Sequence, residues 1–184
     1  MYQYFSFKKL LIIFLCVVIF VVFLLSSRVV PQVQVGKITA VDDKAGLGWN
    51  IAIISDIDFK SENGEFINTT LQCPLFEESA DKYNPDYSAK LRIFGSDVAE
   101  LNSKVNNGKE NSLLYQSVFT VRLEKIRSGS AGGYDWVLGG DITDILNKID
   151  KVNCKIVATR YLFSPVYSRE ITILSRDLLL NYKE

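Results

Sequence analysis

Hydrophobic residues follow two different patterns along this chain. From Leu10 to Leu25, sixteen consecutive residues carry neither a charge nor a hydrogen-bonding polar side chain. Beyond Arg28, apolar and polar residues alternate over short stretches that are separated by turn-forming residues. A continuous apolar run is typical of a membrane span, whereas alternation with a period of two is typical of half-buried β-strands. The pattern therefore predicts an N-terminal membrane segment followed by a β-rich domain.

Residues 10–27 are predicted to form a transmembrane anchor. These eighteen residues span about 27 Å as a helix, which reaches across a hydrocarbon core of about 30 Å when the flanking Lys8, Lys9 and Arg28 snorkel. A cleaved signal peptide is the alternative. Cleavage requires small residues at alternate positions, whereas Ser26 and Ser27 follow two leucines, so the sequence favours an uncleaved anchor.

The charges beside this segment predict its orientation. Two lysines and no acidic residue precede it, which favours a short cytoplasmic tail over residues 1–9. Residues 28–184 then form an extracytoplasmic domain, periplasmic or extracellular. No second apolar run follows, so the sequence predicts a single-pass protein of the inner (plasma) membrane that contacts the lipid bilayer through residues 10–27.

The distal domain is predicted to be mainly β. Leu113–Ile126 alternates most regularly, and Asn63-Gly64 is a strong hairpin signal that would pair the strands on either side of it. Pro74–Ser88 is expected to be an exposed loop. The expected strands are Gln32–Val41, Trp49–Lys60, Glu65–Cys73, Ala89–Phe94, Leu113–Ile126, Tyr134–Leu138, Val152–Phe163 and Glu170–Leu180, the last two around a turn at Ser164–Arg169.

Helical spacing of apolar residues predicts short helices at Ser96–Val105 and at Asp141–Ile149, where Asp141 would be the cap. Many strands with one or two short helices, and no alternation of strand and helix, favour an antiparallel β-sandwich-like domain, immunoglobulin-like or α+β.

Cys73 and Cys154 are the only cysteines beyond the predicted anchor. An even number of cysteines in an oxidising compartment predicts a disulfide, here between packed sheets. A reactive thiol, which would have no histidine to activate it, and two buried free thiols are the alternatives. The segment Ile149–Ile173 resembles the last two strands of immunoglobulin-like sandwiches, with a cysteine strand, a turn that holds Tyr167 and Ser168, and a return strand.

Composition and charge exclude several classes of function. The chain has 21 basic and 21 acidic residues, and removing Lys8 and Lys9 leaves the distal domain at 19 − 21 = −2, so nucleic-acid binding is not expected. The chain has no histidine, which excludes Ser-His-Asp and Cys-His catalysis and histidine-ligated zinc.

Other candidate chemistry is weak, and no cofactor is predicted. Asp56 and Asp58 could form a carboxylate pair, but a solvated strand face explains them better. Asp141, Asp144 and Asp150 lack the spacing of a calcium loop, so no metal site is predicted.

Aromatic residues in or beside loops are more suggestive, because Tyr, Trp and Arg dominate protein interfaces. These aromatic residues are Tyr83, Tyr87, Tyr134, Trp136, Tyr161, Phe163, Tyr167 and Tyr182, about half of which could instead close the ends of the core. The candidate interface comprises Arg160, Tyr161, Phe163, Tyr167 and Arg169.

The sequence thus predicts a membrane-anchored extracytoplasmic binding or scaffolding protein with a protein partner, and not an enzyme. A subunit of an envelope complex and an immunity-type protein are two kinds of protein within this class. The alternatives are a small-ligand or lipid-binding domain and a carboxylate-dependent cell-wall hydrolase.

Overall fold

A computed structural model describes residues 9, 11–18, 30–41, 48–59, 66–76, 83, 90–98, 103–106, 113–127, 133–160 and 163–182. The chain divides into two compact units, Met1–Val30 and Pro31–Glu184. Residues 11–18 are helical. Within the described ranges, no helix has both the length and the hydropathy that a membrane span requires. Residues 10 and 19–27 of the predicted anchor lie outside those ranges, so the anchor stays a prediction.

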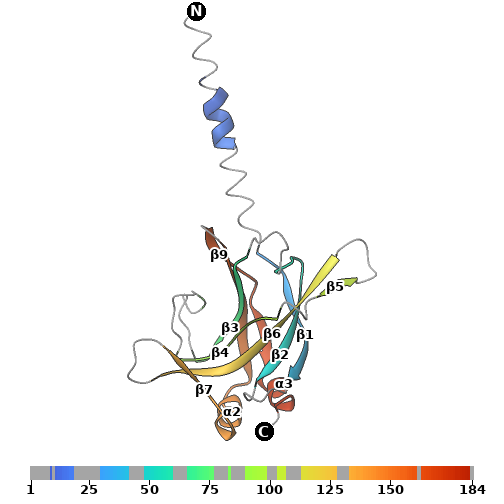
Figure 1. The fold of residues 1–184 in the computed structure, drawn as a ribbon, viewed down its shortest axis with the longest axis vertical. Coiled ribbons are helices and arrows are strands. Elements are labelled where there is room, and N and C mark those ends of the chain that lie inside the picture. Colours follow the sequence, from blue (N-terminus) through green and yellow to red (C-terminus); the bar gives the residue numbers. More distant parts are fainter. Residues whose placement is uncertain are drawn as a thin grey trace, which may run out of the picture. The chain divides into compact units, whose positions relative to one another are not determined.

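The described residues of the second unit form one antiparallel sheet of ten strands (Figure 1). Its longest path runs in the order β1-β2-β6-β4-β3-β8-β10, with β5 and β7 paired to β6 and β9 paired to β8. The mainly β, antiparallel prediction is therefore confirmed. The strands are β1 (Val33–Ala40), β2 (Trp49–Ser55), β3 (Asn68–Pro74), β4 (Leu91–Asp97), β5 (Ser103–Asn106), β6 (Leu113–Ile126), β7 (Tyr134–Trp136), β8 (Lys151–Arg160), β9 (Phe163–Tyr167) and β10 (Ile171–Leu174).

The sheet curls until the two ends of this path meet. β1 and β10 contact each other, and the Arg169 N–H, just before β10, donates a hydrogen bond to the Pro31 carbonyl (3.0 Å). Opposing walls of the curled sheet therefore pack around one core, as expected of a sandwich-like domain, although both walls belong to the same sheet. The core residues from the strands are Trp49, Ile51, Ile53, Leu71, Cys73, Ile93, Phe119, Val121, Leu123, Val152, Cys154, Ile156, Ala158, Ile171 and Ile173.

β6 organises this sheet and has the bounds that its alternation predicts. Ser117, Phe119, Val121 and Leu123 are buried, and β6 pairs with β2 along one edge and with β4 along the other. Gly95 of β4 permits the close pairing with β6, because a Cβ atom at this position would overlap the Thr120 carbonyl oxygen.

Two short helices, α2 (Gly140–Leu146) and α3 (Ser175–Leu180), lie at the end of the domain opposite to β9 (Figure 1). Both contribute to the core, and the buried Trp49 indole N–H donates a hydrogen bond to the Leu178 carbonyl (2.8 Å). The prediction of a helix in this region is confirmed for α2. However, the N-cap is Gly139, which has no side chain to cap the helix. Asp141 lies in the first turn instead, where its negative charge interacts favourably with the positive end of the helix dipole.

The hairpin predicted at Asn63-Gly64 is wrong as a pairing of strands. β3 pairs with β4 and β8, whereas β2 pairs with β1 and β6. The connection between β2 and β3 contributes the buried Phe59, which packs against Phe66 with ring centroids 6.1 Å apart. The strands on either side of Asn63-Gly64 therefore pair with other strands and not with each other.

The helix predicted over Ser96–Val105 is also wrong. Ser96 and Asp97 belong to β4 and pair with Thr120 and Phe119, and residues 103–106 form β5. The long β6 offers a hydrogen-bonding edge to both segments, and this tertiary pairing outweighs a helical spacing of only three apolar residues.

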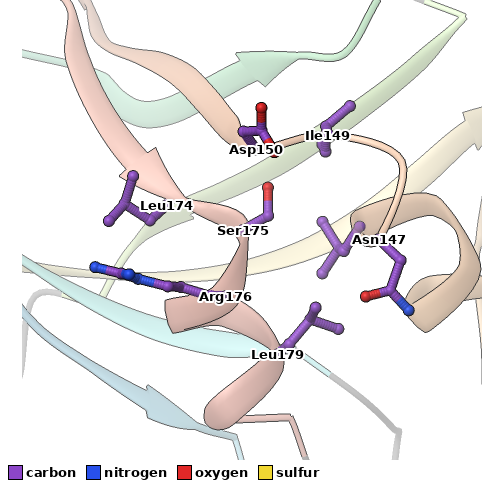
Figure 2. Close-up of a pocket in the computed structure, with 8 residues that line it drawn as sticks. Asn147, Ile149, Asp150, Leu174, Ser175, Arg176 and Leu179 are labelled. Atoms are coloured by element: carbon purple, nitrogen blue, oxygen red, sulfur yellow. The ribbon is translucent and has the colours of Figure 1, made fainter.

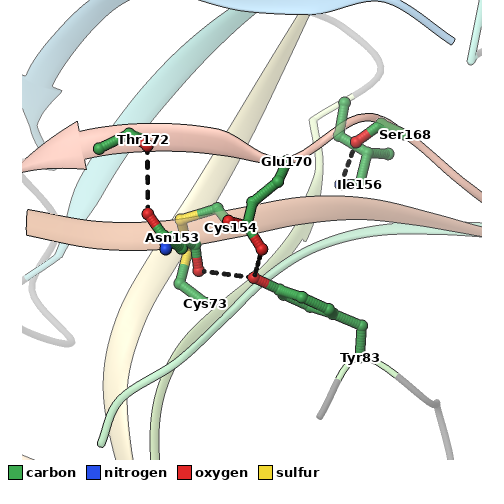
Figure 3. The surroundings of a disulfide bond; sticks show 8 residues. All are labelled: Cys73, Tyr83, Asn153, Cys154, Ile156, Ser168, Glu170 and Thr172. Carbon is green, nitrogen blue, oxygen red and sulfur yellow. Dashed lines mark hydrogen bonds between the residues drawn. A yellow bond between two sulfur atoms is a disulfide. The ribbon is translucent and has the colours of Figure 1, made fainter. Parts of the chain in front are cut away.

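The last predicted strand and turn are partly wrong. Glu170–Leu180 remains extended only to Leu174, after which α3 begins, and most of the predicted turn Ser164–Arg169 belongs to β9. β8 and β10 pair in an antiparallel manner, as the likeness of Ile149–Ile173 to immunoglobulin-like sandwiches implies. Ser168 ends β9, since its N–H donates to the Ile156 carbonyl and its hydroxyl accepts from the Ile156 N–H (Figure 3).

The predicted disulfide between Cys73 and Cys154 is present, with the Cα atoms 4.2 Å apart (Figure 3). Its predicted position between two packed sheets is wrong. Gln72 pairs with Lys155, so the next step of the register places Cys73 of β3 directly opposite Cys154 of β8 in the same sheet. The side chains of both half-cystines belong to the core, because they lie at inward positions of adjacent strands.

Candidate binding face

The candidate interface named from the sequence forms part of a β-hairpin. Arg160 ends β8 and pairs with Phe163 of β9, and the Arg160 guanidinium lies 5.0 Å from the centroid of the Phe66 ring. Tyr167 is half-buried and Arg169 is exposed. Tyr161 and the side chain of Phe163 lie outside the described residues, as does Tyr87. The role of this set as a contact surface stays a prediction.

Tyr83, expected to be an exposed loop aromatic, is only 5% exposed. Its hydroxyl donates to the Glu170 carboxylate (2.9 Å) and lies 3.1 Å from the Asn153 carbonyl oxygen, while the Lys155 ammonium lies 4.7 Å from the ring centroid (Figure 3). Burial, and then the hydrogen bond and charge of Glu170, raise the pKa of Tyr83. Tyr83 is therefore a buried side chain in contact with Asn153 and Lys155 of β8.

A different set of aromatic and charged residues gathers on the outer face of β4, β6 and β7. Alternation along each strand places inward residues such as Ile93 and Leu123 in the core and their neighbours outside. The outer set, called here the aromatic–arginine face, consists of Arg92 and Phe94 of β4, Arg122 and Glu124 of β6, and Tyr134 and Trp136 of β7.

The aromatic–arginine face is held together by stacking and by an ion pair. The Arg92 guanidinium lies 4.0 Å from the ring centroid of Phe94 and 3.7 Å from that of Tyr134, and it pairs with Glu124 at 3.1 Å. The Arg122 guanidinium lies 4.2 Å from the Trp136 ring centroid. These contacts connect the three strands and hold both guanidinium groups against aromatic rings.

The electrostatics of this face follow from its partial burial. The side chains of Arg92 and Glu124 are both mostly buried. Burial raises the pKa of Glu124 above its usual value, although the positive charges of Arg92 and Arg122 act in the opposite direction. Removing either arginine would therefore leave the carboxylate in a poorly solvated position with less compensation.

Exposed apolar groups border the aromatic–arginine face. Trp136 is 46% exposed and Leu138, two residues further along the chain, is 55% exposed. Ile126 is exposed at the end of β6, where its backbone pairs with Tyr134. Large apolar groups beside fixed arginines are typical of the centre of protein interfaces.

Sequence reasoning singled out Tyr134 and Trp136 but missed their partners. Arg92 and Arg122 lie far earlier in the chain and meet the aromatic rings only through strand pairing. The alternation of Arg122 and Glu124 with Val121 and Leu123 in the most regular strand was the available signal.

The acidic residues considered as candidate catalytic or metal-binding groups lie at the following places in the fold. The Asp56 carboxylate accepts a hydrogen bond from the Gln32 N–H (3.0 Å) and thereby fastens the start of β1. Asp141 and Asp144 lie on α2, and the Asp150 carbonyl accepts from the Ser175 N–H (3.0 Å). The described part of the chain holds no group of three or more His, Cys, Asp or Glu side chains able to hold a metal ion.

A pocket of about 410 Å³ lies between α2 and α3 (Figure 2). Apolar residues and polar groups share its lining, and the Ser175 hydroxyl is buried without a hydrogen-bond partner among the described residues. The pocket is lined by Leu146, Asn147, Ile149, Asp150, Leu174, Ser175, Arg176 and Leu179. Leu146 in this lining belongs to the core, and Ile149 and Leu179 pack against the core.

The fold and this face define a small mainly β domain with a disulfide, closed at one end by two short helices. No protein-family model, no curated protein and no solved structure matches the chain.

Proposed function

We propose that this protein is a membrane-anchored, extracytoplasmic binding or scaffolding protein, which holds a protein partner at the membrane through the aromatic–arginine face. The observation that carries this proposal is the stacking of Arg92 and Arg122 on Phe94, Tyr134 and Trp136. Trp, Tyr and Arg are the residue types most enriched among those that dominate binding energy.

The preorganisation of these side chains favours binding. Rings and guanidinium groups that are already fixed lose less conformational freedom when a partner docks, so more of the interaction energy appears as affinity. An envelope-complex subunit and an immunity-type protein both act through such a surface, and the β8–β9 hairpin around Arg160 and Phe163 would supply a second contact region.

The first unit supports the membrane location. Residues 11–18 are helical, and the large apolar side chains among them are all exposed. A helix that is apolar on every side requires apolar surroundings, which a lipid bilayer provides. The buried disulfide supports an oxidising compartment for the second unit, since such bonds are rare in the cytosol.

Location is tested by extracting membranes with alkaline carbonate and by adding protease to the extracytoplasmic side. We expect the chain to stay in the membrane pellet, and we expect added protease to degrade the second unit without lysis of the cytoplasm. Release of the intact chain by carbonate, or protection of the second unit until lysis, would contradict the proposed location.

Binding is tested by purifying the full chain from mild detergent in three forms: wild type, Trp136→Ala and Leu180→Ala. Leu180 is 81% exposed on α3, so its substitution removes a comparable exposed apolar group outside the aromatic–arginine face. We expect a stoichiometric partner to accompany wild type and Leu180→Ala and to be lost from Trp136→Ala. Equal recovery from all three forms would rule out this face as the binding surface.

A further inference from the structure

We propose that the pocket between α2 and α3 binds a free amino acid with an aliphatic side chain. The ammonium group of this ligand meets Asp150, its carboxylate meets Arg176, and its side chain packs on the apolar part of the lining. The pocket shares no residue with the aromatic–arginine face, so this inference goes beyond the proposed function and does not depend on it.

The size of the pocket and its apolar residues suit a small organic molecule. Its volume of about 410 Å³ lies within the range of about 300–1,000 Å³ that is typical of ligand pockets. Leu146 of the lining belongs to the core, and Ile149 and Leu179 pack against the core. An aliphatic side chain that enters the pocket is therefore removed from water against side chains that the fold holds in place.

Two opposite charges line this pocket without pairing with each other. Asp150 lies between α2 and β8, and Arg176 lies in the first turn of α3. Among the residues that the structure describes, no ion pair joins the two. The Arg176 guanidinium instead lies 3.7 Å from the carboxylate of its neighbour Asp177, and such an exposed pair contributes little. A zwitterion can meet both charges of the lining at once, whereas an amine or an acid leaves one of them unmet.

The lining also contains uncharged polar groups. Ser175 is 3% exposed, and its hydroxyl has no hydrogen-bond partner in the described part of the chain. Figure 2 shows this hydroxyl directed toward Asp150. Asn147, which follows α2, adds a side-chain amide to the same lining. A few polar groups that converge on an otherwise apolar pocket are the groups that orient a small ligand.

Isothermal titration calorimetry tests the inference, because it measures binding without a reporter group. The full chain in nanodiscs of neutral phosphatidylcholine is titrated with leucine and with three compounds that each lack one of its groups. These compounds are 3-methylbutylamine, which lacks the carboxylate, 4-methylpentanoate, which lacks the ammonium group, and glycine, which lacks the aliphatic side chain. We expect saturable binding of leucine and binding at least about tenfold weaker for each of the other three.

Substitutions assign this binding to the pocket. Asp150→Asn and Arg176→Gln should each weaken the binding of leucine about tenfold, because each removes one charge of the lining. Asp144→Asn and Arg169→Gln are the matched controls, since both residues are exposed and lie outside the lining, and they should leave the affinity unchanged. All four substitutions replace exposed side chains, so each variant should fold.

Three results would overturn the inference. The first is the absence of saturable heat with leucine. The second is binding of the amine or of the acid as tight as that of leucine, which would show that the site does not use both charges. The third is an unchanged affinity in Asp150→Asn or Arg176→Gln, or an equal loss in the two control variants, which would place the binding elsewhere.

Discussion

Removing the disulfide between Cys73 and Cys154 should lower stability strongly while leaving the fold unchanged. The two cysteines are separated by 81 residues, so the bond closes a long loop in the unfolded chain. The chain-entropy relation gives a stabilisation of about 4.5 kcal/mol for such a loop at 25 °C. Since β3 and β8 are already joined by their backbone ladder, the pairing of the strands does not depend on the bond.

The assay is urea unfolding of the full chain in detergent, followed by tryptophan emission, because the buried Trp49 becomes exposed on unfolding. With a denaturant slope of about 2 kcal/mol per M, the double substitution Cys73→Ala, Cys154→Ala should lower the unfolding midpoint by about 2 M. Reduced wild type should behave similarly. Cys16→Ala is the control, because Cys16 is a free cysteine of the first unit.

A midpoint shift below about 0.5 M, with the bond of the wild type shown to be intact by mass spectrometry, would refute this reasoning. It would mean that the unfolded chain is already restricted, or that the two strands do not share the register that places the cysteines opposite each other.

Two further predictions concern packing and pH. Gly95→Ala should destabilise the domain by more than about 3 kcal/mol, because its Cβ would overlap the Thr120 carbonyl, whereas Gly140→Ala in α2 has open space and should be neutral or stabilising by up to about 1 kcal/mol. Equal urea midpoints for these variants would contradict the close pairing of β4 and β6. Tyr83→Phe should cost about 1–2 kcal/mol at neutral pH, because it removes the hydrogen bond to Glu170. The pKa of Tyr83 is raised in the folded state, so this advantage of wild type is complete below about pH 10 and declines as pH rises toward the folded-state pKa. Urea unfolding of both forms between neutral and alkaline pH measures the decline, and a difference independent of pH would refute it.

The sequence predicted the elements that are marked by a long alternation of apolar and polar residues or by apolar residues at helical spacing. β6 alternates over most of its fourteen residues, and Ile142 and Leu146 lie one helical turn apart on α2, so both elements were predictable. The disulfide was predictable because only two cysteines lie beyond the apolar run.

Apart from the pairing of β8 with β10, the neighbours of the strands were not predictable, because they are set by packing between distant segments. Phe59 is buried in the core, and nothing in the local Asn-Gly signal reveals this. Tyr83 lies in a segment rich in loop-forming residues, and its partner Glu170 is 87 residues away.

The same limit applies to the aromatic–arginine face. Tyr134 and Trp136 drew attention as aromatic residues, but the arginines that stack on them belong to β4 and β6. Only the register of three strands brings these side chains together, so the composition of the face emerges from the fold and not from any single motif.

The most direct test of the central claim is site-specific photocrosslinking in living cells. A photoreactive phenylalanine derivative, which keeps an aromatic ring, replaces Trp136 on the aromatic–arginine face or Leu180 on α3, both of which are exposed in the isolated chain. The account predicts a discrete protein adduct from position 136, weakened by Arg122→Gln, and none from position 180. Adducts of the same mass and yield from both positions, or an adduct from position 180 alone, would contradict it.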